Sequence, residues 1–333
     1  MPFISELVKH SSCSIVGLEK NTGKTVCLNY VLRRLPLDQK TVAVSSIGID
    51  GENTDQVTLT SKPEIVLRKG MFFATSEKHY LMRRLVSELV DVSDESTSLG
   101  RVVTAKALTP GKILLSGPSS GAGLKRWMDG VKPFGIDLII VDGALSRMSL
   151  ASPAISESMI LSTGAAYSAN INTLVQKTAF VVELINLDKT SDDNCQIMNQ
   201  INNGVWALDH EGRLHDLEVA SAFSTNLKID FESCKTLFIN GALTDNFLKH
   251  IKQHRAFKET ELVVRDFTKI FATPMVFKSF VSTGHPIHVI LKSKLIAVTV
   301  NPTSPNGIVL DSDKLCKTLS EAIQLPVYDL MKN

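Results

Sequence analysis

The sequence predicts an α/β fold, in which a mainly parallel sheet carries helices on both faces and a smaller αβ domain follows. Short apolar runs alternate with helical patterns through the first half of the chain, which is typical of strand–helix–strand units. A polar stretch, "DKTSDDNCQ" (188–196), then interrupts the alternation, and a second series of strands and helices follows it. The 333 residues suffice for two domains, which we place at 1–187 and 188–333.

Apolar runs bounded by turn residues predict the strands of the first domain, and apolar residues at helical spacing predict its helices. In "EKHYLMRRLVSELV" (77–90), apolar residues between Leu81 and Leu89 fall on one helical face. The run 65–75 indicates two strands that turn at Gly70. The predicted strands are 13–17, 41–48, the pair within 65–75, 101–107, 112–117, 137–143 and 159–164, and the predicted helices are 24–34, 77–90, 124–135 and 170–187.

The second half of the chain reads as another αβ block. "VWALDHEGRLHDL" (205–217) has the pattern of a hairpin that turns at Glu211 and Gly212. Further strands are predicted at 235–241, 261–266, 287–292 and 295–300, and helices at 244–254 and 313–324. Because this block contains no catalytic motif, we expect it to contact a partner or to couple a partner to the first domain.

Composition excludes several classes of protein. Lysine and arginine number 36 and aspartate and glutamate 34, so the net charge of +2 argues against a dedicated nucleic-acid surface. The five cysteines form no Cys-x-x-Cys pair, which favours reduced thiols over a zinc site. The first residues lack the apolar core of a signal peptide, and no apolar run approaches the ~20 residues that span a bilayer. We therefore expect a soluble, cytoplasmic protein that binds neither nucleic acid nor membrane.

The segment "GLEKNTGKT" (17–25) has the character of a phosphate-binding loop, with one residue more between its glycines than the common pattern. It directly follows a buried strand and opens an amphipathic helix, where backbone N–H groups and the helix dipole favour anions. Lys24 would reach the β- and γ-phosphates, and the Thr25 hydroxyl would ligate Mg²⁺. An ordinary strand–turn–helix with a surface lysine is the alternative. The predicted nucleotide-binding residues are Gly17, Asn21, Thr22, Gly23, Lys24, Thr25 and Val26.

Two acidic residues at strand ends are candidates for the carboxylate that a Mg²⁺ site needs near Thr25. Asp142 ends the apolar run "DLIIVDG" (137–143), and Asp50 closes the second predicted strand. Because ligands of open α/β sheets bind beyond the carboxyl ends of strands, both acids would converge on the loop. The alternatives are that Asp142 caps the N-terminus of a helix and that Asp50 is a turn residue. We thus assign catalysis to Lys24, Asp50 and Asp142, and metal binding to Thr25, Asp50 and Asp142.

Other segments offer weaker signals. "SGPSSGAG" (116–123) precedes a predicted helix with Lys125 and Arg126 and either holds an anion or is a flexible connection. Arg147 either faces the phosphates or lies on the surface. His250 and His254 share a helical face but lack the acidic residue of a His-Glu-x-x-His zinc site, so we interpret them as exposed residues. Because the guanine-specific motif Asn-Lys-x-Asp does not occur, ATP is favoured over GTP.

The loop resembles that of dethiobiotin synthetase and its relatives in the SIMIBI class of P-loop NTPases. The phrases "SIVGLEKNTGKT", "DLIIVDGALSR", "ILSTGAA" and "AVTVNPTSPNG" also resemble the P-loop subunits of lysine 5,6-aminomutase reactivases. The second resemblance implies an ATPase that helps to replace damaged cobalamin on a B12-dependent aminomutase, with a MutS-like ATPase as the second subunit. SIMIBI proteins commonly form homodimers across the nucleotide. A cobalamin motif of the form Asp-x-His-x-x-Gly does not occur in this sequence.

Two other functions fit the same loop. A small-molecule ligase or kinase of the dethiobiotin synthetase or cobyrinic acid amidase type would phosphorylate a carboxylate, with 116–123 lining its substrate pocket. A nucleotide-gated regulator would bind ATP with negligible turnover. In the favoured reading, Asp50 and "GENTDQVT" (51–58) would form a switch that is ordered with ATP and loosened with ADP.

Overall fold

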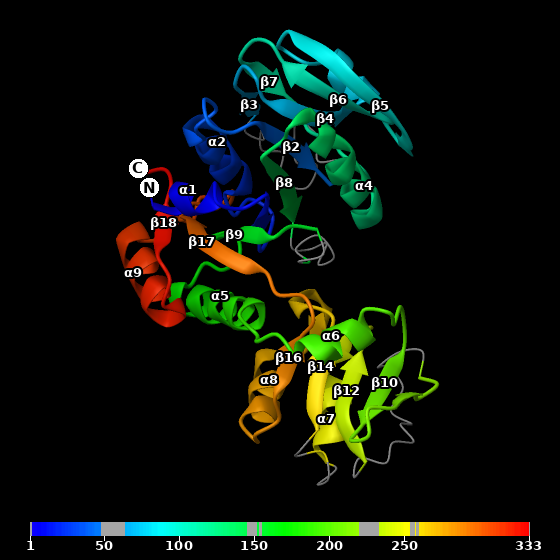
Figure 1. The fold of residues 1–333 in the computed structure, drawn as a ribbon. Coiled ribbons are helices and arrows are strands. Elements are labelled where there is room, and N and C mark those ends of the chain that lie inside the picture. The colour runs from blue at the N-terminus through cyan, green and yellow to red at the C-terminus, as the bar shows by residue number, and fades with distance from the viewer. Residues whose placement is uncertain are drawn as a thin grey trace. The chain divides into compact units, whose positions relative to one another are not determined.

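The computed structural model describes residues 2–47, 64–144, 152, 155–219, 233–253, 257 and 260–332. The chain forms two compact units (Figure 1). The first unit comprises residues 1–179 and 293–333, and the second comprises residues 180–292. The predicted boundary between 187 and 188 lies close to the first crossing, but the chain also returns to the first unit at residue 293.

A nine-stranded sheet forms the centre of the first unit, in the order β18-β17-β9-β1-β8-β2-β4-β6-β5. Neighbouring strands from β18 to β4 run parallel, whereas β6 is antiparallel to both β4 and β5. The α/β class with a large, mostly parallel sheet is therefore confirmed. The strands are β1 (Ser12–Gly17), β2 (Val42–Ser46), β4 (Phe72–Ser76), β5 (Ser87–Thr97), β6 (Gly100–Ala107), β8 (Leu138–Ala144), β9 (Ser158–Gly164), β17 (Lys294–Asn301) and β18 (Val327–Asp329).

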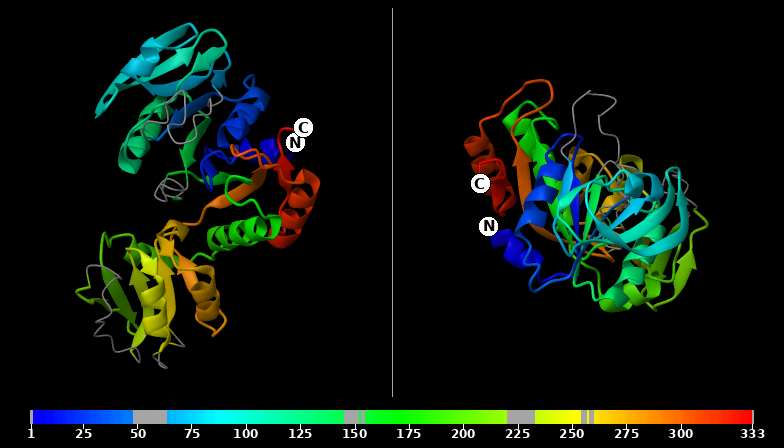
Figure 2. Two further views of the ribbon diagram at one scale, coloured as in Figure 1. Left: turned by 180° about the vertical axis from the view of Figure 1, so that it is seen from behind. Right: turned by 90° about the horizontal axis from the view of Figure 1, so that it is seen from above.

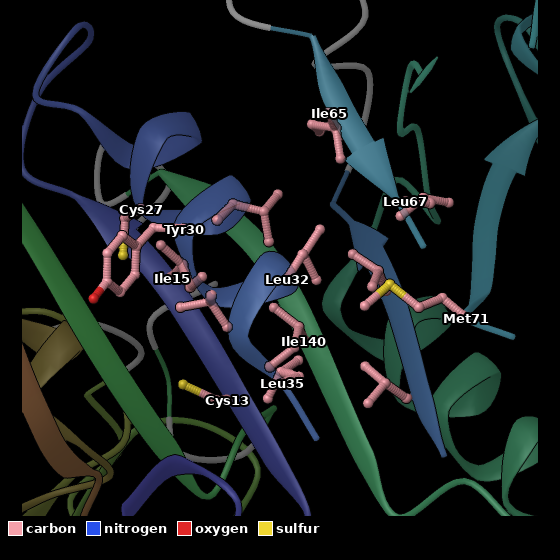
Figure 3. Close-up of a cluster of buried hydrophobic side chains, with 14 of the residues drawn as sticks. Cys13, Ile15, Cys27, Tyr30, Leu32, Leu35, Ile65, Leu67, Met71 and Ile140 are labelled. Atoms are coloured by element: carbon pink, nitrogen blue, oxygen red, sulfur yellow. The ribbon is translucent and has the colours of Figure 1, made fainter. Parts of the chain in front are cut away.

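Two helices cover opposite faces of this sheet. Helix α2 (Lys24–Arg34) packs its apolar side, including Leu32, against Ile15 and Ile140 (Figure 3). Helix α4 (Gly121–Val131) packs against the other face of the sheet, where alternate residues of the same strands, such as Ile139 of β8, point. Because successive side chains of a strand point to opposite faces, the single apolar run of β8 supplies both layers. The long apolar run of the strand predicted at 137–143 follows from this double burial.

The remaining elements of the first unit are short or peripheral. The α1 helix (Pro2–Leu7) precedes β1, α3 (Glu77–Leu81) follows β4, and α9 (Ser312–Ile323) lies between β17 and β18. Strands β3 (Ile65–Leu67) and β7 (Gly111–Ile113) form a separate antiparallel pair, and η1 (Lys132–Phe134) ends α4. The predicted pair within 65–75 does not form, because β3 pairs with β7 and β4 with β2 and β6.

The predicted helix over 77–90 is wrong beyond its first residues. Helix α3 ends at Leu81, and β5 begins at Ser87. Leu81 is 80% exposed and Leu89 is 54% exposed, so the apolar face that the helical pattern suggested is not buried. Strand β5 instead gains backbone hydrogen bonds by pairing with β6, and this long-range pairing overrides the local helical pattern.

The C-terminal segment 293–333 belongs to the first unit and not to a C-terminal domain. Strand β17 pairs in parallel with β9, from Lys294 opposite Ser158 to Asn301 opposite Gly164. The two chain termini consequently lie side by side in the views of Figures 1 and 2. The predicted domain 188–333 is corrected accordingly, since only 180–292 forms a separate unit. The first crossing between units falls within helix α5 (Ile171–Ile185), and the polar stretch 188–196 lies inside the second unit. A polar stretch also carries no information about a return of the chain.

The second unit is built on a five-stranded sheet in the order β11-β10-β12-β14-β16. The predicted hairpin at 205–217 is confirmed as the antiparallel pair β10 and β11, and Gly212 takes the left-handed conformation (φ 82°) in its turn. The elements of the second unit are α6 (Asp192–Met198), β10 (Val205–Asp209), β11 (Leu214–Asp216), β12 (Cys234–Ile239), β13 (Leu243–Thr244), α7 (Asp245–Lys252), β14 (Glu261–Val264), η4 (Phe267–Lys269), β15 (Ile270–Phe271), α8 (Pro274–Val281) and β16 (Ile287–Val289). Helix α5 (Ile171–Ile185) begins in the first unit and ends in the second.

Among the described residues, no helix combines the length and the apolar character that a membrane crossing requires.

Candidate functional site

The candidate site lies at the carboxyl edge of the nine-stranded sheet, where β1 continues into the segment 17–25. Strand β8 lies between β1 and β2, and its residue Asp142 is in register with Ile15 of β1 and Ser46 of β2. Because all three strands are parallel, the segment after Gly17 and the acid near the end of β8 reach the same edge. Parallel α/β sheets generally bind ligands there.

Close packing inside the loop requires glycine at position 17. A Cβ atom added to Gly17 would lie 2.8 Å from Thr22 Oγ1 and 3.2 Å from the carbonyl oxygen of Glu19. The Thr22 hydroxyl donates a hydrogen bond to that same Glu19 carbonyl (2.8 Å), and Thr22 is 1% exposed. This internal hydrogen bond links two residues within the loop.

Two left-handed residues turn the chain into helix α2. Asn21 has φ 62° and Gly23 has φ 91°, a region that favours glycine and tolerates asparagine. Helix α2 starts at Lys24, and Gly23 at its N-cap provides no side-chain hydrogen bond to the first turn. The first amides of a helix have no intrahelical partner, so this end of α2 presents hydrogen-bond donors and partial positive charge.

Lys24 and Asp142 come together at this edge. The Lys24 ammonium Nζ lies 3.2 Å from Asp142 Oδ1, and the two side chains are 16% and 5% exposed. An ion pair with so little solvent around it is screened much less than a surface pair. Buried charges are costly unless they are paired, so Lys24 and Asp142 each supply the charge that the other requires.

The chemistry of the oxygen donors fits Mg²⁺. Thr25 supplies a hydroxyl in the first turn of α2 and Asp142 a carboxylate, and hard oxygen ligands are those that Mg²⁺ prefers. Val26 follows in the same turn and is half-buried like Thr25. Within the described ranges, no group of three or more His, Cys, Asp or Glu side chains could hold a metal ion. Mg²⁺ is usually held by one or two carboxylates together with substrate phosphates and needs no such cluster.

Several predicted site residues lie outside the described residues. They are Asp50, the switch segment 51–58, Arg147 and His254. Their assignments therefore remain predictions.

Strand β17 contacts the loop through Asn301, a residue that the sequence patterns do not assign to the site. The side-chain amide of Asn301 donates to the carbonyl oxygen of Asn21 (2.9 Å), and a Cβ atom on Gly23 would lie 3.0 Å from Asn301 Cβ. Strand β9 adds a second contact, from the Leu18 amide to the Ser162 carbonyl (2.9 Å). The phrase "NPTSPNG", which begins at Asn301, was the available signal, but its position beside the loop depends on long-range strand pairing.

The segment 116–120 also lies at this edge, beside β2. A Cβ atom on Gly117 would lie 2.0 Å from the carbonyl oxygen of Ser46, so only glycine permits this approach. Ser116 is buried and accepts a hydrogen bond from the Ser76 amide (2.9 Å). It also lies 2.8 Å from His79 Nδ1. Burial lowers the pKa of His79, and the neighbouring Lys78 charge lowers it further.

The predicted anion site at the start of α4 is partly occupied by the protein itself. Ser120 caps the helix by accepting a hydrogen bond from the Gly123 amide (3.0 Å). The Arg126 guanidinium donates to Glu95 Oε1 (2.7 Å, from Nε), so its charge is already paired with that carboxylate.

None of the five cysteines is in a disulfide bond, and four of them are buried. Burial raises the pKa of Cys13 and Cys27 to about 12, which keeps both thiols protonated and unreactive.

In comparisons with protein-family models, curated proteins and solved structures, none of these matches the chain.

Proposed function

We propose that this chain binds ATP with Mg²⁺ on the loop 17–25 and hydrolyses it. The observation that carries the proposal is the 3.2 Å approach of the Lys24 ammonium to the Asp142 carboxylate, at the carboxyl ends of adjacent parallel strands. A lysine at a helix N-terminus beside a strand-end acid is the arrangement that P-loop NTPases use for phosphate and metal. The left-handed residues Asn21 and Gly23 support it by turning the chain sharply into α2.

In this proposal each residue has a defined task. The loop amides and the α2 N-terminus bind phosphate oxygens, and Lys24 moves from Asp142 to the β- and γ-phosphates. Asp142 is then available, with the Thr25 hydroxyl, to orient Mg²⁺. The bound ion would neutralise charge on the phosphate oxygens. Asp50 remains a second candidate ligand.

The Asp142→Asn variant tests the metal role. The amide keeps the shape of the side chain but removes its negative charge, so we expect ATP hydrolysis to fall by at least tenfold. Nucleotide affinity measured without metal should change much less. Asp129→Asn, which removes an exposed carboxylate from α4, is the matched control. Equal hydrolysis by Asp142→Asn and the wild type would move the metal role to another acid.

We further propose that hydrolysis drives a conformational change in a B12-dependent aminomutase, with a MutS-like ATPase as the second subunit. This part rests on the resemblance of the sequence phrases to reactivase P-loop subunits. Turnover should then be slow for the chain alone and should rise when an aminomutase carrying damaged cobalamin and the second subunit are added. A lack of stimulation would contradict the coupling while leaving ATP hydrolysis intact.

A small-molecule ligase or kinase is the second candidate. The approach of Gly117 to Ser46 favours it, because the segment 116–120 thereby lies at the same sheet edge as Asp142. Such an enzyme would turn over ATP only with an added carboxylic acid or amine. ATP binding with negligible turnover under all these conditions would instead support a nucleotide-gated regulator.

A further inference from the structure

Helix α4 and the strands β5 and β6 enclose a groove of about 400 Å³ in the first unit. This volume lies in the range of small-molecule sites. The apolar part of its wall includes Trp127, Val131 and Phe134 from α4 and its end, and Val102 from β6. The Trp127 ring is fixed in position because its Nε1 donates to Thr104 Oγ1 (3.0 Å). The groove therefore combines an ordered aromatic side chain with an aliphatic surface.

An irregularity in β5 directs acidic side chains into this groove. Val92 pairs with Val103 and Ser96 with Arg101, so β5 has two residues more than β6 across this stretch. The extra length brings consecutive residues of β5 to the same wall, which alternation in a regular strand would prevent. Ser93, Asp94 and Glu95 line the groove next to Asp91.

The charge of the groove is negative. Among the lining residues that the structure describes, Arg126 is the one cation, and it pairs with Glu95. In the described part of the chain, no salt bridge joins Asp91 or Asp94. Two carboxylates thus line a groove that Trp127 also lines. Carboxylates attract cations, and the face of an aromatic ring attracts them as well.

Helix α4 leaves space for a ligand at Gly130. Glycine near the end of a helix is less favourable than alanine, yet Gly130 lines the groove, and a Cβ atom added there would meet nothing within 4 Å. The groove is therefore not filled by protein atoms next to Gly130.

We propose that this groove binds a small organic cation, an ammonium or guanidinium group carried on an apolar stem. The charged group would lie against Asp91 and Asp94, and the stem against Trp127 and Val131. This inference does not depend on nucleotide binding. The same chemistry would also fit a lysine or arginine side chain of a partner protein, and the experiment below separates the two sources.

Titration of the full chain with n-hexylammonium chloride, at constant ionic strength, tests the proposal. The readout is the indole N–H signal of Trp127 in ¹H–¹⁵N spectra. The chain has two tryptophans, so a Trp206→Phe background makes this signal unique. We expect a saturable shift with hexylammonium and none with hexan-1-ol, which has the same stem and no charge. No saturable shift, or equal shifts with both compounds, would overturn the proposal.

Four variants make the test specific to the groove. Asp91→Asn and Asp94→Asn should each weaken hexylammonium binding by about two- to fivefold, the range of exposed ion pairs. Glu88→Gln removes one charge from the same strand outside the groove and should leave binding unchanged. Gly130→Leu should block the groove while favouring the helix, so its loss of binding would not reflect unfolding. Equal affinity in Gly130→Leu and the wild type would place the cation elsewhere.

A second titration, with a short lysine peptide, identifies the source of the cation. Acetyl-Ala-Lys-Ala-amide is titrated under the same conditions. Tighter binding of hexylammonium than of the peptide supports a free amine as the ligand. Tighter binding of the peptide, still weakened by Asp94→Asn, assigns the groove to a side chain of a partner and overturns the small-molecule form of the proposal.

Discussion

Asn301 holds the loop 17–25 through a hydrogen bond to Asn21, which lies 280 residues away in sequence. Its amide hydrogen bond to the Asn21 carbonyl stabilises a residue with positive φ, a conformation that is unfavourable for most side chains. A loop that is held in shape before the ligand arrives loses less entropy on binding. Asn301 is thus a positioning residue for the proposed nucleotide site.

We expect Asn301→Ala to weaken the affinity for an ATP analogue by about two- to tenfold, the range of one hydrogen bond. Asn306→Ala, an exposed change in the same segment, should have no effect. Isothermal titration calorimetry provides the comparison. If Asn301→Ala and Asn306→Ala bind the analogue equally well, the contact does not position the loop.

His79 makes the stability of the first unit dependent on pH. Burial lowers its pKa below the ordinary value of 6.5, so the folded chain favours the neutral ring and the unfolded chain binds the proton more readily. The stability from neutral His79 is fully present above about pH 6.5 and is lost as the pH falls through the lowered pKa.

Urea unfolding at pH 7.5 and pH 5.5 tests whether stability falls at the lower pH. The wild type should lose more stability between these values than His79→Asn, whose amide can replace Nδ1 toward Ser116 without titrating. Identical pH dependence of the two chains would mean that His79 is not the group responsible.

At the scale of elements, glycines mark where backbones approach each other. A Cβ atom on Gly164, at the end of β9, would lie 2.1 Å from the carbonyl oxygen of Asn301 in β17. That oxygen accepts a hydrogen bond from the Ala165 amide (2.9 Å), so it cannot move freely. The close approach fixes the end of β17 beside the loop.

We expect Gly164→Ala to lower the free energy of unfolding by about 1–3 kcal/mol. Gly130→Ala, in open space on α4, should raise it by up to about 1 kcal/mol. Denaturant midpoints of both variants measure the contrast. A neutral Gly164→Ala would show that β9 and β17 are not packed as closely as described.

Local sequence patterns predict the buried strands well and the edge of the sheet poorly. A strand such as β8 is buried on both faces, so its sequence is a short and nearly continuous apolar run bounded by turn residues. The segment 77–90 is amphipathic at helical spacing, yet its second part becomes the start of β5. An edge strand buries little, so its side-chain pattern is weak, and pairing with β6 decides its structure.

Local patterns likewise predict some residues of the candidate site and not others. Lys24 and Asp142 could be predicted, because each follows or ends a recognisable strand and parallel strands share a carboxyl edge. Asn301 could not be assigned, because its place depends on β17 pairing with β9 after an intervening unit of more than 100 residues. Hydrophobic periodicity describes neighbours in sequence and contains no information on that pairing.

At the scale of the whole molecule, the first unit is completed only by the C-terminal segment. A fragment of residues 1–187 lacks β17 and β18, and it exposes the edge of β9 together with its apolar neighbours. We expect this fragment to aggregate, or to unfold without a cooperative transition, in urea monitored by circular dichroism.

A deletion of the second unit provides the matched control. The Val289 amide donates to the Asp188 carbonyl (2.9 Å), so a short glycine–serine linker can replace residues 190–288. This chain retains the nine-stranded sheet and should unfold cooperatively. Cooperative unfolding of the 1–187 fragment at the same midpoint would contradict the assignment of 293–333 to the first unit.

The central claim is that the loop 17–25 binds nucleotide phosphates through Lys24. Calorimetric titration of the wild type and of Lys24→Ala with a slowly hydrolysed ATP analogue and Mg²⁺ tests it most directly. Loss of a charge-assisted contact of about 1.5–3 kcal/mol predicts at least a tenfold weaker affinity in Lys24→Ala. Lys69→Ala, an exposed lysine in a turn of the same unit, should bind like the wild type. No binding by the wild type, or unchanged affinity in a folded Lys24→Ala variant, would contradict the claim.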